Sequence, residues 1–506
     1  MANKKIPPFS VAEKRDIILY VLGIMCYKFA LESYTGTISS LALDRFPVGK
    51  RFFYKGFLDG FNQAAQCVGS IAVAPLMRRF RIKNILAVAI AMFAVISSLG
   101  MIIEGATGGK PPQDGRSAIA GKWDARIIIP IFVAAGFSHG TVELIRRVIP
   151  RDIVGGDVVK LKRMDAIVHI FYEVAGTSGA FFSAFIQLEM GKAYAPVVTP
   201  FLFAIAAVIW SRIRLNTAKQ NALEGIDHKD VHTGLHAIGA AFASFGYAIY
   251  KGGQIIFSDR KFSWLLLGYS LPLFLHRYLE NGLAQNYAKL ILDQAAYGQI
   301  IVGGSNFGEL IGAAFVLAFS TAVKTPLPWL RLDALTLSIT WVLWKADPSE
   351  VGNLQMAWIL AGIFVFISSG WAAGDCSLSA FIQSNLSRMN NTDPRVSPLG
   401  AVMAFLYVSY IITFAILNPV LGNWLDSLWN TQGEAGAREY FFWIGGVFYS
   451  LCGVVIMAAT FIPRGSFALN PKLDDYDREE ENDVDTANGE KHPNKNQEMI
   501  EEIVAG

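Results

Sequence analysis

The stretch GFSHGTVEL at residues 136–144 has a counterpart, GWAAGDCSL, at residues 370–378. The two glycines and the leucine of both stretches coincide at one offset. Shortly afterwards AIVHIFY, at 166–172, matches AVMAFLY, at 401–407, at nearly the same offset. Glycines four residues apart are common wherever helices pack closely, so one such stretch says little by itself. Two matches in the same order predict a chain built from two similar halves.

Around this repeat, the apolar residues form blocks that are long enough to cross a bilayer as helices. Of the 506 residues, 53% are apolar and only 17% are charged, and the charges lie mostly between the blocks. A spanning helix needs roughly 20 apolar residues, whereas a strand of a membrane barrel needs only about ten. Twelve blocks are evident, near 16–42, 54–77, 84–104, 126–149, 165–189, 195–215, 262–285, 296–320, 326–345, 355–384, 398–422 and 439–462. The sequence therefore predicts an all-α polytopic membrane protein with 12 transmembrane helices, arranged as two pseudo-symmetric six-helix bundles.

The chain divides into four regions by composition. Residues 1–215 and 262–463 hold the two six-helix bundles, 216–261 form a cytoplasmic linker, and 464–506 form a polar tail. The linker contains a Gly/Ala-rich stretch at 231–258, which is short for a span and favours an interfacial helix. Whether this stretch crosses the bilayer stays open, and a crossing would invert the second bundle. The tail carries twelve acidic against five basic residues, which predicts a disordered segment with little apolar surface to bury.

The placement of lysine and arginine predicts that the N-terminus lies inside, since short cytoplasmic loops favour these residues. The basic turn at 78–83, the run at 146–163 and the tail then lie inside, although the outer loops near 45–55 and 110–126 are also basic. The polar N-terminus lacks the apolar core of a cleaved signal peptide, so the first span is expected to act as the insertion signal. We expect a monomeric multi-pass protein of the lipid bilayer, in the plasma membrane rather than an internal membrane.

Other classes of protein are disfavoured. The net charge of +3 is too small to argue for a nucleic-acid partner, and no basic stripe with interleaved aromatic residues is present. The four cysteines lie within apolar blocks, where thiols behave as small hydrophobic groups, so neither a disulfide nor a metal site is predicted. The sequence shows no phosphate-binding loop and no nucleophile beside a base. We therefore expect no enzyme, no catalytic residue and no cofactor.

The turn APLMRRFRIK at 74–83 lies between the second and third blocks, where transporters of the major facilitator superfamily carry a Gly-x-x-x-Asp-Arg-x-Gly-Arg-Arg motif. With the six-plus-six layout and the long central segment, residues 16–462 resemble this superfamily. The resemblance implies a small-molecule secondary transporter that works by alternating access about a midplane site. It also implies that the first, fourth, seventh and tenth blocks line a central cavity, and that the second and eighth blocks act as gates.

The four lining blocks carry ionisable side chains, which are costly inside a membrane and usually face a cavity or a partner. The predicted substrate and proton pathway contains Lys28, Glu32, Glu143, His276, Arg277, Glu280 and Asp375. The predicted gating residues are Asp59, Glu309, Arg78 and Arg79. The pairs Lys28–Glu32 and Arg277–Glu280 each lie within one turn and could instead be neutralised structural pairs. His169 and Glu173, spaced four apart, are expected to form a packed hydrogen-bonded pair, with a proton relay as the alternative.

The favoured function is secondary active transport of a small organic solute, with protons as a candidate coupling ion. In that case one or more of Glu32, Glu143, Glu280 and Asp375 titrates during transport. The identity of the substrate and the direction of transport stay open. The alternative is a transporter-like sensor or scaffold that signals through the acidic tail. Removing residues 464–506 separates the two readings, because a transporter should still move solute without them.

Overall fold

Helices make up nearly all of the computed structural model, which describes residues 9–113, 118–154, 158–214, 235–319, 322–323, 325–387 and 396–471. Within these ranges, the named β structure is one isolated bridge between Lys110 and Ile119. The predicted all-α fold class is confirmed.

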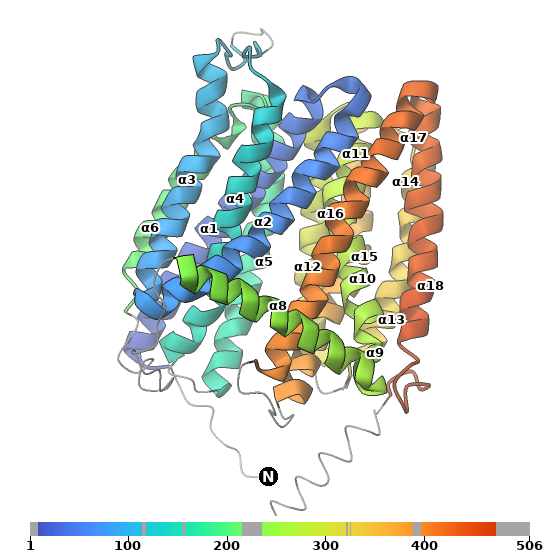
Figure 1. The fold of residues 1–506 in the computed structure, drawn as a ribbon. Coiled ribbons are helices and arrows are strands. Elements are labelled where there is room, and N and C mark those ends of the chain that lie inside the picture. The colour runs from blue at the N-terminus through green and yellow to red at the C-terminus, as the bar shows by residue number, and fades with distance from the viewer. Residues whose placement is uncertain are drawn as a thin grey trace, which may run out of the picture.

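The first six apolar blocks form the N-terminal bundle, drawn from blue to green in Figure 1. Its helices are α1 (Val11–Arg45), α2 (Arg51–Arg79), α3 (Ile82–Ala106), α4 (Ile128–Val154), α5 (Val158–Met190) and α6 (Val198–Ser211). The start of α1 is set by a capping box, in which Ser10 Oγ accepts from the Glu13 N–H at 3.1 Å. In return, a Glu13 carboxylate oxygen accepts from the Ser10 N–H at 2.7 Å. Both bonds satisfy backbone donors that the helix itself leaves unbonded.

The last six blocks form the C-terminal bundle, and three of them are broken helices. Its elements are α9 (Arg260–Ser263), α10 (Leu271–Tyr278), α11 (Ala284–Leu290), α12 (Gly298–Phe319), α13 (Leu327–Thr336), α14 (Val342–Lys345), α15 (Asn353–Ser387), α16 (Pro398–Gln432), α17 (Glu434–Tyr440) and α18 (Tyr449–Ala459). A π-helical turn, Leu279–Leu283, separates α10 from α11 within the seventh block. Such turns re-aim side chains and are frequent at functional sites.

Seven of the described helices are long and apolar enough to cross a membrane, by length and composition. They include α1, α3, α15 and α16, and they have their counterparts among the predicted blocks. The helix at Ala195–Ser211 is apolar but shorter. The other blocks are helical as well, but α2 and α5 fall short in hydropathy and the remaining ones are interrupted. The low hydropathy of α2 and α5 has a structural reason, because both face the interior cavity described below.

The two bundles lie side by side and meet along two helix pairs, α2 with α16 and α5 with α12. Within each bundle, α2 packs on α4 and α12 packs on α15. The glycines of the sequence repeat lie at such close crossings. A Cβ on Gly140 would lie 1.8 Å from the Gln66 carbonyl oxygen on α2, and one on Gly370 would lie 3.0 Å from Asp333 Cα on α13. Small residues at these positions allow the helix backbones to approach.

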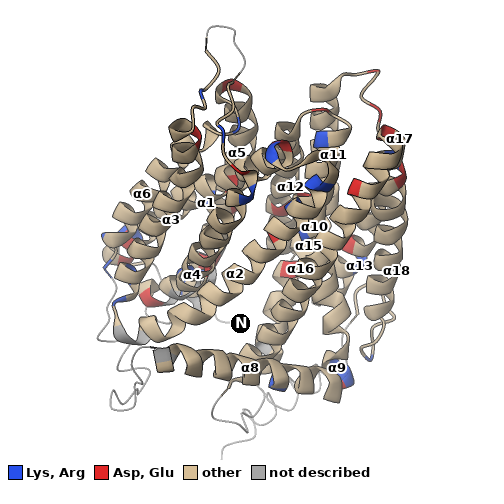
Figure 2. Cartoon of the chain, turned by 45° about the horizontal axis from the view of Figure 1, so that its top comes forward, with Lys and Arg blue, Asp and Glu red and all other residues tan. Residues whose placement is uncertain are grey.

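Helix α8 (Leu235–Ser258) lies obliquely across the two bundles near the end that carries the N-terminus (Figures 1 and 2). It contacts both α2 and α16, and it is not among the helices apolar enough to span. At Gly252 a Cβ would lie 2.0 Å from the Ala401 carbonyl oxygen of α16, so only glycine fits this crossing. The stretch 231–258, which the sequence leaves open, is described from residue 235 onward, and there it runs across the bundles.

Candidate functional site

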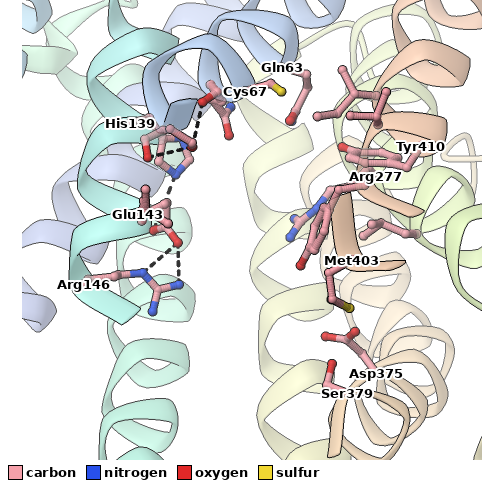
Figure 3. A pocket seen from close by; sticks show the side chains of 18 of the residues that line it. Gln63, Cys67, His139, Glu143, Arg146, Arg277, Asp375, Ser379, Met403 and Tyr410 are labelled. Atoms are coloured by element: carbon pink, nitrogen blue, oxygen red, sulfur yellow. Dashed lines mark hydrogen bonds and ion pairs between the residues drawn. The ribbon is translucent and has the colours of Figure 1, made fainter. Parts of the chain in front are cut away.

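A cavity of about 1640 Å³ lies between the two bundles. One wall comes from α1, α2, α4 and α5, and the other from α10, α12, α15 and α16, with α8 along one side. Figure 3 shows the two walls facing each other, with His139, Glu143 and Arg146 opposite Arg277 and Tyr410. The volume exceeds the roughly 300–1,000 Å³ of ordinary small-molecule pockets. It therefore has room for an organic solute together with water.

The two bundles are joined at the end of the molecule that lies away from the N-terminus, which we call the closed end. There Asp44 at the end of α1 pairs with Lys289 of α11 at 2.7 Å. Lys55 of α2 donates to the backbone oxygen of Asn281 at 3.2 Å. At the opposite end the cavity wall continues to residues such as Ser397, at the N-terminus of α16. The cavity thus reaches from the middle of the molecule toward the end that carries the N-terminus.

The N-terminal wall holds two ion pairs, of which the sequence predicted one, Lys28–Glu32. Glu143 on α4 pairs with Arg146 at 2.6 Å, and His139 Nε2 lies 3.6 Å from the same carboxylate. Lys28 on α1 pairs with Glu32, four residues on. Both cations lie over the Tyr172 ring of α5, with Lys28 Nζ 4.5 Å and the Arg146 guanidinium carbon 4.4 Å from the ring centroid.

The C-terminal wall holds the second cluster of predicted residues. Arg277 on α10 pairs with Glu280 of the π-helical turn at 3.1 Å. The other carboxylate oxygen of Glu280 accepts from Ser305 Oγ on α12 at 2.7 Å, and Ser305 Oγ lies 2.6 Å from Ser368 Oγ on α15. Asp375 on α15 also lines the cavity. Arg277, Glu280 and Asp375 therefore face one space together with Lys28, Glu32 and Glu143.

His276 does not line the cavity. It is 2% exposed, its Nε2 lies 2.8 Å from Asp333 on α13, and its ring stacks on Trp371 at 5.1 Å. Trp371 is the residue that faces the cavity at this place. His276 therefore lies behind the cavity wall and packs against Trp371.

Two of the predicted gating residues, Asp59 and Glu309, line the cavity. Asp59 on α2 is bound to Lys55 at 2.5 Å, and the amide of Asn418 on α16 lies 3.5 Å from the same oxygen. Glu309 on α12 forms no hydrogen bond or ion pair with any described residue. Arg78 and Arg79 form the last turn of α2, and their side chains lie outside the described part of the structure.

The expected hydrogen bond between His169 and Glu173 is not formed. His169 Nε2 instead lies 3.8 Å from Cys376 Sγ, on α15 of the other bundle. Glu173 is 4% exposed, lines the cavity, and its Oε2 has no hydrogen-bond partner among the described residues. Sequence spacing pointed to the wrong partner, because residues four apart share a helix face but need not face each other.

Comparisons with solved structures find the fold of this chain in several transporters. The nucleoside transporter NupG matches with a TM-score of 0.58 and 12% identity, over 88% of this chain and 99% of its own. The xylose transporter XylE from E. coli, in a partially occluded inward open conformation, matches with a TM-score of 0.56 and 13% identity, over 87% and 97%. A structure of a proton dependent oligopeptide transporter matches with a TM-score of 0.57 and 11% identity, over 88% and 98%.

The likeness is one of three-dimensional structure. No protein-family model matches the sequence, and no curated protein sequence matches it either. The structural matches extend over both bundles, with nearly the whole length of each matched protein covered. The resemblance read from the basic turn and the two halves is confirmed at the level of architecture, and the chain has the fold of the major facilitator transporters.

Proposed function

We propose that this protein is a secondary active transporter that carries a small polar organic solute across a membrane by alternating access. The observation that carries the proposal is the cavity between the bundles, with ion pairs on both of its walls. A closed core would replace such pairs with apolar residues, because desolvating two charges costs more than their attraction returns in many proteins. Charged groups around a wet passage keep part of their hydration and can bind a polar solute.

The closed end supports a working cycle in which the cavity opens to one side at a time. Contacts between the bundles at that end, such as Asp44 with Lys289, would break when the bundles rock in the opposite sense. With the predicted N-terminus inside, the structure corresponds to a state that faces the cytoplasm. We further propose a monomer in the plasma membrane, with protons as the coupling ion.

The test uses the full chain in two steps. Metabolite profiling of cells with and without the protein, inside and outside the cell, selects candidate solutes. Exchange of each labelled candidate is then measured in proteoliposomes. We expect saturable exchange that Arg277→Gln reduces at least tenfold and that Arg126→Gln, in the exposed outer loop, leaves unchanged. Absence of exchange for every solute whose distribution depends on the protein would overturn the proposal.

A chain that ends at Pro471 separates transport from signalling. The residues beyond Pro471 lie outside the described part of the structure. A transporter should keep its exchange rate in this shortened chain, because the cavity residues are all retained. A sensor that works through the acidic tail would instead keep solute binding and lose its cellular response.

A further inference from the structure

Helices α5 and α12 come from different bundles and cross in an antiparallel sense beside the cavity. A Cβ on Gly303 of α12 would lie 2.5 Å from the Phe181 ring of α5. A Cβ on Gly176 of α5 would lie 3.6 Å from Asn306 Nδ2 of α12. Residue numbers therefore rise along α5 as they fall along α12.

This register brings two carboxylates to one level. Glu173 precedes Gly176 by three residues, and Glu309 follows Asn306 by three residues. In antiparallel helices these steps run in the same direction, so both acids lie one turn from the crossing, on the same side of it. Both also line the cavity. An acid of the N-terminal bundle thus faces an acid of the C-terminal bundle.

Polar atoms around this pair lack the partners that burial normally demands. Glu173 is 4% exposed and its Oε2 has no partner among the described residues. Asn306, at the crossing, is 5% exposed and its Nδ2 donor is also without a described partner. Glu309 forms no ion pair with any described residue. A cation also lies at the crossing, because Lys28 Nζ would lie 3.5 Å from a Cβ on Gly176, but Lys28 pairs with Glu32.

The cations close enough to act on the pair are each bound to a carboxylate of their own. They form the ion pairs Lys28–Glu32, Arg146–Glu143 and Arg277–Glu280. Lys28, Arg146 and Arg277 are the cations that act on Glu173, and Glu309 also experiences the negative charge of Glu280. The neighbouring titratable groups are His169 and Tyr172 on α5 and Asp375 and Cys376 on α15, and His169 Nε2 lies 3.8 Å from Cys376 Sγ. Glu173 and Glu309 are therefore carboxylates that have no ion-pair partner among these three cations.

Two ionised carboxylates that face each other repel, and one proton between them removes the repulsion. Resting on the transport function proposed above, we propose that Glu173 and Glu309 form the proton-binding pair that couples proton movement to the rocking of the two bundles. The proton enters from water in the cavity and is held by one carboxylate, which donates it to the other. The helices of the pair belong to different bundles, so rocking changes their separation and releases the proton to water.

Protonation of the Glu173–Glu309 pair can be tested by spectroscopy without knowing the solute. Infrared difference spectra of the full chain, titrated over the neutral range, should contain the C=O band of one protonated carboxyl group. Either Glu173→Gln or Glu309→Gln should remove the whole band, because the remaining carboxylate no longer has a negative neighbour. Glu189→Gln, on α5 but outside the cavity, should keep it. A band that survives in both single variants overturns the proposal.

Transport assays separate the failure of this proposal from the failure of the transport function. In proteoliposomes, both Gln variants should keep solute exchange without a gradient and lose at least tenfold of the accumulation driven by a pH gradient. Exchange together with unchanged pH-driven accumulation in both variants overturns the pair and leaves transport standing. Accumulation that follows a Na⁺ gradient at constant pH also overturns it. Thermal unfolding of each variant, similar to the unmodified chain, shows that the fold is retained.

Discussion

The carboxylate of Asp426, on α16, accepts a hydrogen bond of 2.8 Å from the backbone N–H of Phe53, in the first turn of α2. A second bond, 3.2 Å long, comes from the N–H of Phe52. The residue that precedes α2, Lys50, makes no side-chain cap of its own. The first N–H groups of a helix need acceptors and favour a negative charge. The N-terminal bundle therefore has one of its helices capped by the C-terminal bundle, at the closed end.

Replacement of Asp426 by Ala should open the closed end. Each hydrogen bond to a charged group is worth about 1.5–3 kcal/mol, so the loss of two should shift the balance between the two access states more than tenfold. Spin labels at positions 48 and 430, which are exposed on opposite bundles, should report a longer distance in this variant. Asp426→Asn keeps an acceptor and should have a smaller effect. An unchanged distance in the Ala variant would contradict the capping role.

The helical blocks were predictable because span length and hydropathy are local properties of the sequence. The ion pairs Lys28–Glu32 and Arg277–Glu280 were predictable for the same reason, since their partners lie within one turn. The partner of His276 was not, because Asp333 lies 57 residues further along the chain. No local signal shows which face of a lining helix is turned away from the cavity.

The neighbour of Glu173 could not be predicted from local spacing either. Its spacing from His169 suggested a pair within α5, but His169 contacts Cys376 of the other bundle. The acid that faces Glu173 is on α12, and only the antiparallel register of the two helices reveals this. The sequence nevertheless contained an indication that both acids are unusual. Glu173 and Glu309 are both isolated acids within otherwise apolar or small-residue stretches, which is unusual inside a membrane.

The docking of α8 on α16 can be tested at Gly252. A Cβ there would meet the Ala401 backbone, so Gly252→Leu should displace α8 from the side of the cavity. We expect a lower midpoint of thermal unfolding and faster proteolysis within 235–258. Gly246→Leu is the matched control, since a Cβ at Gly246 meets nothing within 4 Å. Equal behaviour of the two variants would show that α8 is not held by this contact.

Removing one charge of the Glu143–Arg146 ion pair should impair folding more than removing both charges. Arg146→Gln leaves the Glu143 carboxylate in the cavity wall with His139 and the Tyr172 hydroxyl beside it but without its cation. Breaking one side of a buried pair typically costs about 3–5 kcal/mol. We therefore expect little monodisperse protein from this single variant, as measured by size-exclusion chromatography in detergent.

The double variant Glu143→Gln/Arg146→Gln removes both charges and should restore folding. Solute exchange should stay absent, because the charges of Glu143 and Arg146 are lost from the N-terminal wall. Recovery of both folding and exchange in the double variant would mean that the pair is only structural. That outcome would remove Glu143 and Arg146 from the proposed pathway while leaving the cavity itself in place.

Tyr172 should hold Lys28 and Arg146 in place through the faces of its ring. Cation–π contacts contribute about 0.5–2 kcal/mol each when they are shielded from water, and both cations lie within 4.5 Å of the ring centroid. Tyr172→Phe keeps the ring and loses only the hydroxyl contact to Glu143 at 3.5 Å, so its unfolding midpoint should stay close to that of the unmodified chain. Tyr172→Leu removes the ring and should lower the midpoint and weaken solute exchange. If Phe is as damaging as Leu, the hydroxyl group and its contact to Glu143 are the important features, and the cation–π account is wrong.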